Sequence, residues 1–155
     1  SRMSLIFDII KSIRNLRNRI NLKANQAVCV SIFPHKKAYY QLIRDNYELI
    51  INLGNLSSFK VLEENKRPQD TISDISKNAD LYLFFQGLID VKIEQQKIKE
   101  AREKQSKILD GKKARMQNRD FVKKAPRELV EKEKENITEL EDTIRRLGQM
   151  YNELS

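Results

Sequence analysis

The sequence predicts an α+β protein, in which a small three- to four-stranded sheet with two helices precedes a long antiparallel two-helix coiled-coil hairpin. Apolar residues recur at helical spacing near the N-terminus, and short β-rich runs follow between residues 27 and 85. Residues 92–120 contain no aromatic residue and are rich in the strong helix formers Lys, Glu, Gln and Arg. We therefore expect two domains, a small α/β unit at residues 1–88 and a helical hairpin at residues 89–155.

The first helix is expected over residues 4–20, where apolar residues follow one another at intervals of three and four. The members of this stripe are Ile6, Ile9, Ile13, Leu16 and Ile20. A buried strand is expected next, at residues 27–33, because the run is apolar and ends at Pro34. The only cysteine, Cys29, lies inside this run, and we interpret it as a small core residue.

A second helix is expected over residues 37–53, with Gly54 and Asn55 as its C-terminal stop. Further strands are expected at residues 59–62 and 81–85, with residues 71–76 as a hairpin partner and a turn at residues 77–80. Both helices must cover one face of the sheet in order to bury their apolar stripes.

The hairpin is expected to consist of helices at residues 90–118 and 127–154, with its tip near residues 117–127. The second helix has an apolar seam that is interrupted only by Glu133. This seam consists of Val130, Glu133, Ile137, Leu140, Ile144, Leu147, Tyr151 and Leu154. The seam expected on the first helix is thinner and consists of Val91, Ile98, Ala101, Ile108 and Met116. Gln105 and Lys112 interrupt that seam, and Gly111 weakens the helix, so we expect the first arm to be the softer one.

Charge points to a polyanionic partner, because 30 Lys and Arg residues oppose 22 Asp and Glu residues, for a formal net charge of +8. The excess of positive charge is concentrated in one part of the chain. Residues 92–127 contain 13 basic and 5 acidic residues, whereas residues 128–155 contain 4 and 8. Residues 38–91 contain 5 basic and 8 acidic residues, so we expect no RNA-binding platform there.

The predicted nucleic-acid contacts lie at two places, the hairpin tip and the first helix. The candidate residues are Lys112, Lys113, Arg115, Arg119, Phe121, Lys123, Lys124 and Arg127 at the tip, with Arg14 and Arg17 on the first helix. Phe121 has two interpretations, since an aromatic ring there either stacks on an exposed base or closes the end of the helical seam.

Catalytic chemistry has no visible location in the sequence, which contains no glycine-rich phosphate loop, nucleophile elbow or zinc-ligand spacing. We expect no catalytic residue, no cofactor-binding residue and no metal site, and we interpret His35 as a turn residue. No apolar run reaches the length of a membrane span, and a single cysteine suits a reducing compartment, so we expect a cytoplasmic protein without a membrane partner.

Three stretches together resemble the C-terminal region of valyl-tRNA synthetase. Residues 13–17 with Asn21 resemble the end of the family's anticodon-binding domain, and residues 87–91 resemble the entry into its coiled coil. Residues 121–126 with residues 130–133 resemble the tip and the return helix of its hairpin. The resemblance implies a class I ligase that uses ATP to charge tRNA with valine, of which this chain would be a non-catalytic part.

On this resemblance the expected partners are tRNA, whose body the tip would contact through phosphates, and the remaining domains of the parent synthetase. We expect a monomer. The alternative function is a structural hairpin that mediates protein interaction within or between chains through the seam of residues 130–154.

Overall fold

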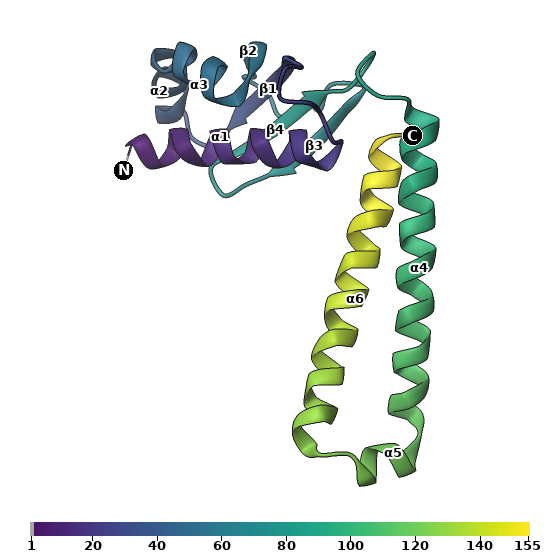
Figure 1. Ribbon diagram of the computed structural model, residues 1–155. Helices are drawn as coiled ribbons and strands as arrows, with labels where there is room; N and C mark the ends of the chain where they lie inside the picture. Colours follow the sequence, from purple (N-terminus) through teal and green to yellow (C-terminus); the bar gives the residue numbers. More distant parts are fainter. Residues whose placement is uncertain (1) are drawn as a thin grey trace. The chain divides into compact units, whose positions relative to one another are not determined.

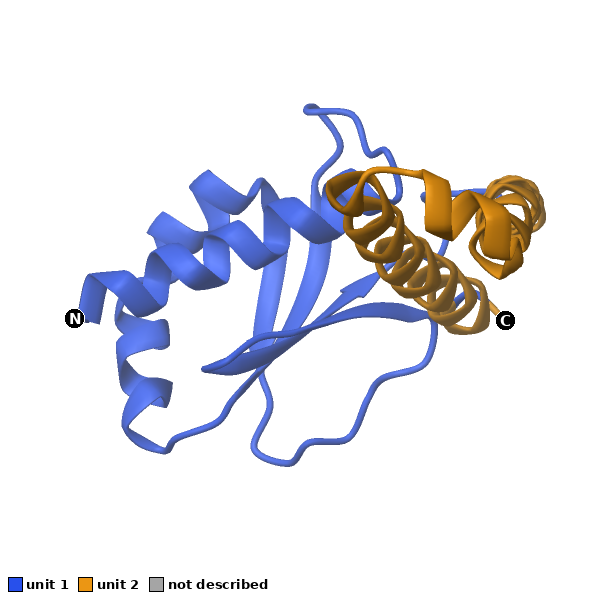
Figure 2. Cartoon of the chain, turned by 90° about the horizontal axis from the view of Figure 1, so that it is seen from below, with its two compact units in different colours: residues 1–90, 154 blue, residues 91–153, 155 orange. Residues whose placement is uncertain are grey.

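The computed structural model describes residues 2–155, and it has the predicted α+β architecture (Figure 1). Its elements are, in chain order, α1 (Arg2–Arg19), β1 (Val28–Pro34), α2 (Ala38–Asp45), α3 (Tyr47–Gly54), β2 (Leu56–Val61), β3 (Thr71–Ile75), β4 (Ala79–Phe84), α4 (Val91–Gln117), α5 (Arg119–Lys124) and α6 (Arg127–Glu153). The chain separates into two compact units, one essentially of residues 1–90 and the other of residues 91–153 (Figure 2).

The first unit contains a four-stranded mixed sheet with the strand order β2-β1-β4-β3. β1 pairs in parallel with β2 and antiparallel with β4, and β3 forms the predicted hairpin with β4. α1 packs on β3 and β4, whereas α3 packs on β2 and against α1. α1 and α3 therefore cover one face of the sheet, as predicted.

The predicted apolar stripe of α1 forms much of the core. Ile6, Ile13 and Leu16 have no exposed surface, and Ile9 is only 1% exposed. They face sheet residues that are equally buried, namely Val30, Ile32, Ile72, Leu81 and Leu83. Each such side chain contributes about 1.5–3 kcal/mol by its removal from water.

The single helix expected over residues 37–53 is wrong, because the structure contains two helices, α2 and α3. Asn46 separates them with φ −108° and ψ 25°, and its side-chain amide donates to the carbonyl of Leu42 at 2.8 Å. An Asn side chain that bonds to nearby backbone competes with the helical hydrogen bonds, which explains the break. The predicted stop is confirmed, since Asn55 takes the left-handed conformation with φ +53°.

The interpretation of Cys29 as a core residue is also wrong. Val28 and Val30 point into the core, and the alternation of a strand turns Cys29 to the opposite face, where it is exposed. Its Sγ lies 3.1 Å from Ser57 Oγ and 3.5 Å from Ser58 Oγ, and these hydroxyl contacts lower the pKa of the thiol. Periodicity alone does not reveal that only one face of this strand is covered by helices.

The second unit is a hairpin in which α4 and α6 run antiparallel and α5 connects them (Figure 1). The seam predicted for α6 has Val130 and Glu133 buried. The seam predicted for α4 is partly wrong, because Ala101 and Ile108 are exposed and Leu109 is buried instead. The half-buried and buried positions of α4 repeat every seven residues, and they include Gln95 as well as the predicted interruptions Gln105 and Lys112.

Three polar residues of the α4 seam have specific partners on the returning chain. Gln95 Nε2 donates to Ser155 Oγ at 3.0 Å, and Lys112 Nζ lies 3.1 Å from Glu133 Oε1. Arg102 lies across Gly148, where a Cβ atom would come within 3.3 Å of its guanidinium. These pairs replace apolar packing in the first arm. None of the helices in residues 2–155 combines the length and apolar character needed to cross a membrane.

Candidate nucleic-acid interface

The hairpin tip is built around α5, a helix of six residues that reverses the chain between the two arms. Asn118 caps its N-terminus, because its side-chain oxygen accepts from the backbone N–H groups of Asp120 at 3.1 Å and Phe121 at 3.3 Å. Pro126 follows α5 and precedes the first residue of α6. Asn118 therefore marks the start of α5, and Pro126 marks the start of α6.

Four basic side chains at this turn are exposed, and none of them forms a side-chain hydrogen bond or ion pair within the described part of the chain. We name them the tip cluster: Arg119, Lys123, Lys124 and Arg127. Lys123 and Lys124 form the last turn of α5, where the helix dipole favours cations. All four were predicted as contact residues, and the structure brings them together on one turn.

Three other predicted contact residues are paired with acids of α6. Lys112 Nζ lies 3.1 Å and Arg115 Nη1 lies 4.0 Å from the carboxylate of Glu133. Lys113 Nζ lies 3.6 Å from Glu141 Oε1, with both side chains about half exposed. Lys112 is the most buried of the three, and its charge is largely neutralised by Glu133 within the hairpin.

Phe121 lies in α5 and is half-buried. The guanidinium carbon of Arg115 lies 5.6 Å from the centroid of its ring, which is the distance of a cation–π contact. The carbonyl of Phe121 accepts from the N–H of Ala125 at 2.8 Å and so ends α5. The ring contacts Arg115 within the tip and keeps some exposed surface, so the choice between base stacking and closure of the seam stays a prediction.

The two predicted contact residues of α1 differ from one another. Arg14 is exposed and donates one hydrogen bond, to the carbonyl of Leu53 at 3.3 Å. Arg17 is only 7% exposed, and its guanidinium donates to the carbonyls of Lys23 at 2.8 Å and Asn55 at 3.2 Å. Arg17 therefore links the end of α1 to the end of α3. Little of its guanidinium group is accessible to a phosphate.

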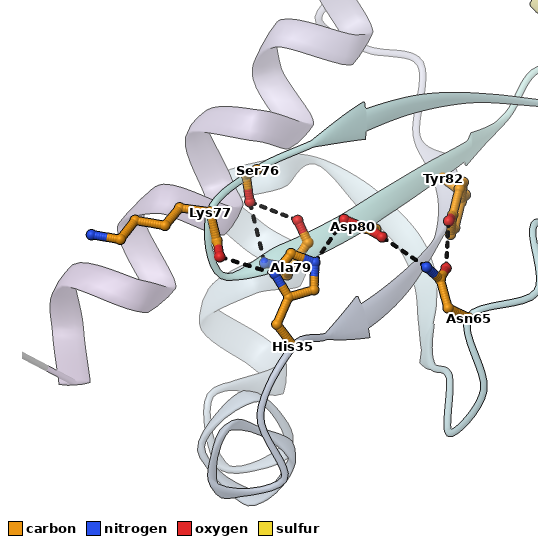
Figure 3. A network of polar contacts seen from close by, with 7 residues as sticks. All are labelled: His35, Asn65, Ser76, Lys77, Ala79, Asp80 and Tyr82. Carbon is orange, nitrogen blue, oxygen red and sulfur yellow. Dashed lines mark hydrogen bonds and ion pairs between the residues drawn. The ribbon is translucent and has the colours of Figure 1, made fainter.

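A chain of polar contacts in the first unit was not anticipated from the sequence (Figure 3). Asp80 is 5% exposed, and its carboxylate lies 2.7 Å from His35 Nε2 and accepts from Asn65 Nδ2 at 3.1 Å. Asn65 Oδ1 in turn accepts from the hydroxyl of Tyr82 at 2.7 Å. In the sequence His35 follows one predicted strand and Asp80 lies in the turn predicted before another, which does not reveal that both residues lie where β1 and β4 pair.

Both nitrogens of His35 face groups that only accept hydrogen bonds, because Nδ1 lies 2.9 Å from the carbonyl of Lys77 and Nε2 faces Asp80. Only the protonated imidazolium has two N–H donors. The Lys77 carbonyl and then the Asp80 carboxylate therefore raise the pKa of His35 above its ordinary value of 6.5.

This arrangement predicts a pH-dependent stability of the first unit. His35 contributes stability that is fully present below pH 6.5, its ordinary pKa, and that is lost as the pH rises through the higher pKa of the folded protein. The chain has one histidine, so an NMR titration of its C2 proton reports on His35 alone. We expect a midpoint above 6.5, and a lower midpoint in Asp80→Asn; a midpoint at or below 6.5 in the unchanged protein contradicts the expectation.

Comparison with known proteins identifies relatives over nearly the whole chain, although no family model matches it. It is 31% identical to the valine--tRNA ligase of Aquifex aeolicus over 95% of its length, which is 12% of that protein. It is 29% identical to the valine--tRNA ligase of Thermotoga maritima over 96% of its length, or 16% of that protein. The ligase of Carboxydothermus hydrogenoformans is 26% identical over 99% of the chain, or 18% of that protein. The chain therefore spans less than a fifth of these relatives, and along nearly its whole length it is homologous to a part of valine--tRNA ligase, which confirms the resemblance predicted from its residues.

Proposed function

We propose that this chain is the non-catalytic, tRNA-binding C-terminal region of a valine--tRNA ligase, and that the tip cluster contacts phosphates of the tRNA body while the ATP-dependent chemistry takes place elsewhere in the enzyme. The observation that carries the proposal is the set of four exposed basic side chains, without acidic partners among residues 2–155, at one turn of the hairpin. The homology to valine--tRNA ligases supports tRNA as the polyanion.

The distribution of ion pairs refines which residues take part. Lys112, Lys113 and Arg115 already have carboxylates within 4.0 Å, so a phosphate that approached them would compete with Glu133 or Glu141. The tip cluster has no such competitor within the described residues. We therefore assign the main contacts to Arg119, Lys123, Lys124 and Arg127, and supporting roles to the paired residues. Contacts of this kind add affinity without reading sequence.

Reversing the charge of three cluster residues tests the proposal. The variant carries Lys123→Glu, Lys124→Glu and Arg127→Glu, and Arg127 is the first residue of α6, where a helix tolerates an acid well. We expect the affinity for tRNA to fall about 100-fold at moderate ionic strength. The slope of log affinity against log salt should become shallower by about 0.7 to 0.9 for each lost contact. Fluorescence anisotropy with labelled tRNA measures both.

The matched control reverses three exposed lysines in the middle of α4, as Lys99→Glu, Lys104→Glu and Lys107→Glu. It changes the net charge by the same amount on the same hairpin. We expect a much smaller loss of affinity, because only the general attraction changes. Equal losses in the two variants would refute the assignment to the tip, and unchanged binding in the tip variant with intact helical circular dichroism would refute the proposed function.

The alternative, a hairpin that serves protein association, has one observation in its favour. Apolar side chains remain exposed on the hairpin, namely Ile93 at 54%, Leu129 at 43%, Ile108 at 41% and Val122 at 38%. They are scattered singly among charged residues, which is normal for a protein surface. If Ile108→Ser and Leu129→Ser disrupt association of the chain in analytical ultracentrifugation while tRNA binding persists, the hairpin has both roles.

A further inference from the structure

We propose that a groove in the first unit binds an unpaired RNA nucleotide, with its base stacked on Tyr47 and its phosphates beside Arg44, Lys60 and Lys66. The proposal rests on the proposed function in one respect, that tRNA is the RNA that supplies the nucleotide, and it adds a contact away from the hairpin. The groove lies between the junction of α2 and α3, strand β2 and the loop of residues 62–70. Its volume is about 930 Å³.

The groove contains an aromatic platform of two stacked rings. Tyr47 is the first residue of α3, and Phe59 lies in β2. Their ring centroids are 4.5 Å apart and the rings are inclined by 28°. Phe59 is 9% exposed, whereas Tyr47 remains 36% exposed. A buried ring thus supports an accessible one, and a tyrosine held in this way loses little freedom when a base stacks on it.

The break between α2 and α3 gives the platform its neighbours. Because Asn46 interrupts the helix, the last turn of α2 and the first residue of α3 both line the groove. Arg44 comes from the former and Tyr47 from the latter. The break therefore places a cation next to the exposed ring, an arrangement that serves single-stranded nucleic acids because every base has a face to stack and a phosphate nearby.

The cations of the groove are available for a ligand. Arg44, Lys60 and Lys66 are exposed, and no side-chain hydrogen bond or ion pair engages them within residues 2–155. Arg67 differs, since its guanidinium donates to the carbonyl and hydroxyl of Thr71 and holds the loop in place. Glu63 and Glu64 also line the groove. The positive excess is therefore small, which suits one or two phosphates rather than a long duplex backbone.

Single-stranded RNA fits these features better than other polyanions do. A duplex keeps its bases stacked on one another, so it leaves the ring of Tyr47 unused. An acidic peptide would use the lysines but has no flat face for the platform. Residues 38–91 are acidic on average, for which reason we expected no RNA-binding platform there, but an average over 54 residues hides three unpaired cations around one aromatic pair.

The test uses the whole chain with Lys123→Glu, Lys124→Glu and Arg127→Glu as background, so that the tip cluster does not mask the groove. The probe is fluorescein-labelled decauridylate at fixed low salt. We expect Tyr47→Leu to raise the Kd about tenfold, because it keeps an apolar cover on Phe59 but removes the stacking face. Tyr47→Phe keeps the face and should bind nearly as the background does.

A second pair of variants keeps the test decisive if Tyr47→Leu unfolds. Lys60→Gln with Lys66→Gln should weaken binding and make the salt dependence shallower by about 1.4, the value for two phosphate contacts of a single strand. The control, Lys99→Gln with Lys104→Gln, removes two exposed lysines of α4 and should leave the Kd within about twofold.

Each outcome of these binding experiments either supports or overturns the proposed nucleotide site. Equal affinity of Tyr47→Leu and Tyr47→Phe would overturn the proposal, as would decaglutamate binding as tightly as decauridylate, because the groove would then recognise charge alone. If Tyr47→Leu weakens decauridylate binding while reversal of the tip charges leaves tRNA binding unchanged, the groove stands and the proposed function fails. If only the tip variant has an effect, the groove fails alone.

Discussion

Replacing Ile13 by alanine is expected to lower the free energy of unfolding of the first unit by about 2–5 kcal/mol. Ile13 lies in the apolar stripe of α1 and has no exposed surface. Its two methyl carbons, Cδ1 and Cγ2, lie 3.3 Å from the position that a Cβ atom would take on Gly54. Removing them leaves a cavity between α1 and α3, which urea unfolding followed by circular dichroism will measure.

Gly54, which lies opposite Ile13, provides a test of whether the cavity causes the loss of stability. A Cβ at Gly54 would lie 3.3 Å from both Ile13 atoms, so Gly54→Ala alone is crowded. In the Ile13→Ala background the same methyl group fills the cavity, and we expect a favourable coupling of about 1 kcal/mol between the two changes. Additive effects would show that the cavity closes by other movements and that the close approach of α1 and α3 has no energetic role.

Replacing Glu133 by alanine is expected to destabilise the hairpin by about 1–3 kcal/mol. The side chain of Glu133 is 9% exposed, and it is the acceptor for Lys112 Nζ at 3.1 Å and 3.4 Å. Its loss leaves an ammonium group with 26% exposure against the seam without a counter-charge. Hydrogen exchange measured by mass spectrometry should show faster exchange in α4 and α6 and no change in the sheet.

The double variant Lys112→Leu with Glu133→Leu separates charge from packing. It replaces the ion pair by two apolar side chains, and such replacements are often neutral or stabilising. We expect protection of the hairpin to return at least to that of the unchanged protein. If the double variant is as unstable as Glu133→Ala, the pair contributes by its shape and not by its charges. Glu141→Ala, which removes the half-exposed partner of Lys113, should cost less than about 0.5 kcal/mol.

Helices and strands whose apolar residues recur at regular spacing were predictable from the sequence. The stripe of α1, the strands β1 and β4 and the two long helices lie within a few residues of their predicted positions, because burial on one face imposes a regular spacing. The errors have local causes. Asn46 broke a helix whose apolar pattern continues across it, and Cys29 lies on the strand face that the helices leave open. Neither effect changes the spacing of apolar residues along the sequence.

The candidate interface was predictable in position but not in detail. A run of basic residues with one acid identifies the hairpin tip, and the structure places Arg119, Lys123, Lys124 and Arg127 there without partners among the described residues. Glu133, the partner of Lys112, lies 21 residues away in the chain, and Asn55, one of the two partners of Arg17, lies 38 residues away, so only the folded structure reveals that these charges are engaged. The same holds for Tyr47 and Phe59, which are 12 residues apart and belong to different elements.

The polar pairs of the hairpin seam also limit how its length can change. If α6 slid by one heptad, Lys112 would face Leu140 or Pro126 instead of Glu133, and Arg102 would lose the space that Gly148 provides. Deletion or insertion of seven residues in one arm alone would create the same mismatch. A hairpin of different reach therefore requires matched heptads in both arms, so the two helices must lengthen or shorten together, in steps of about 10 Å.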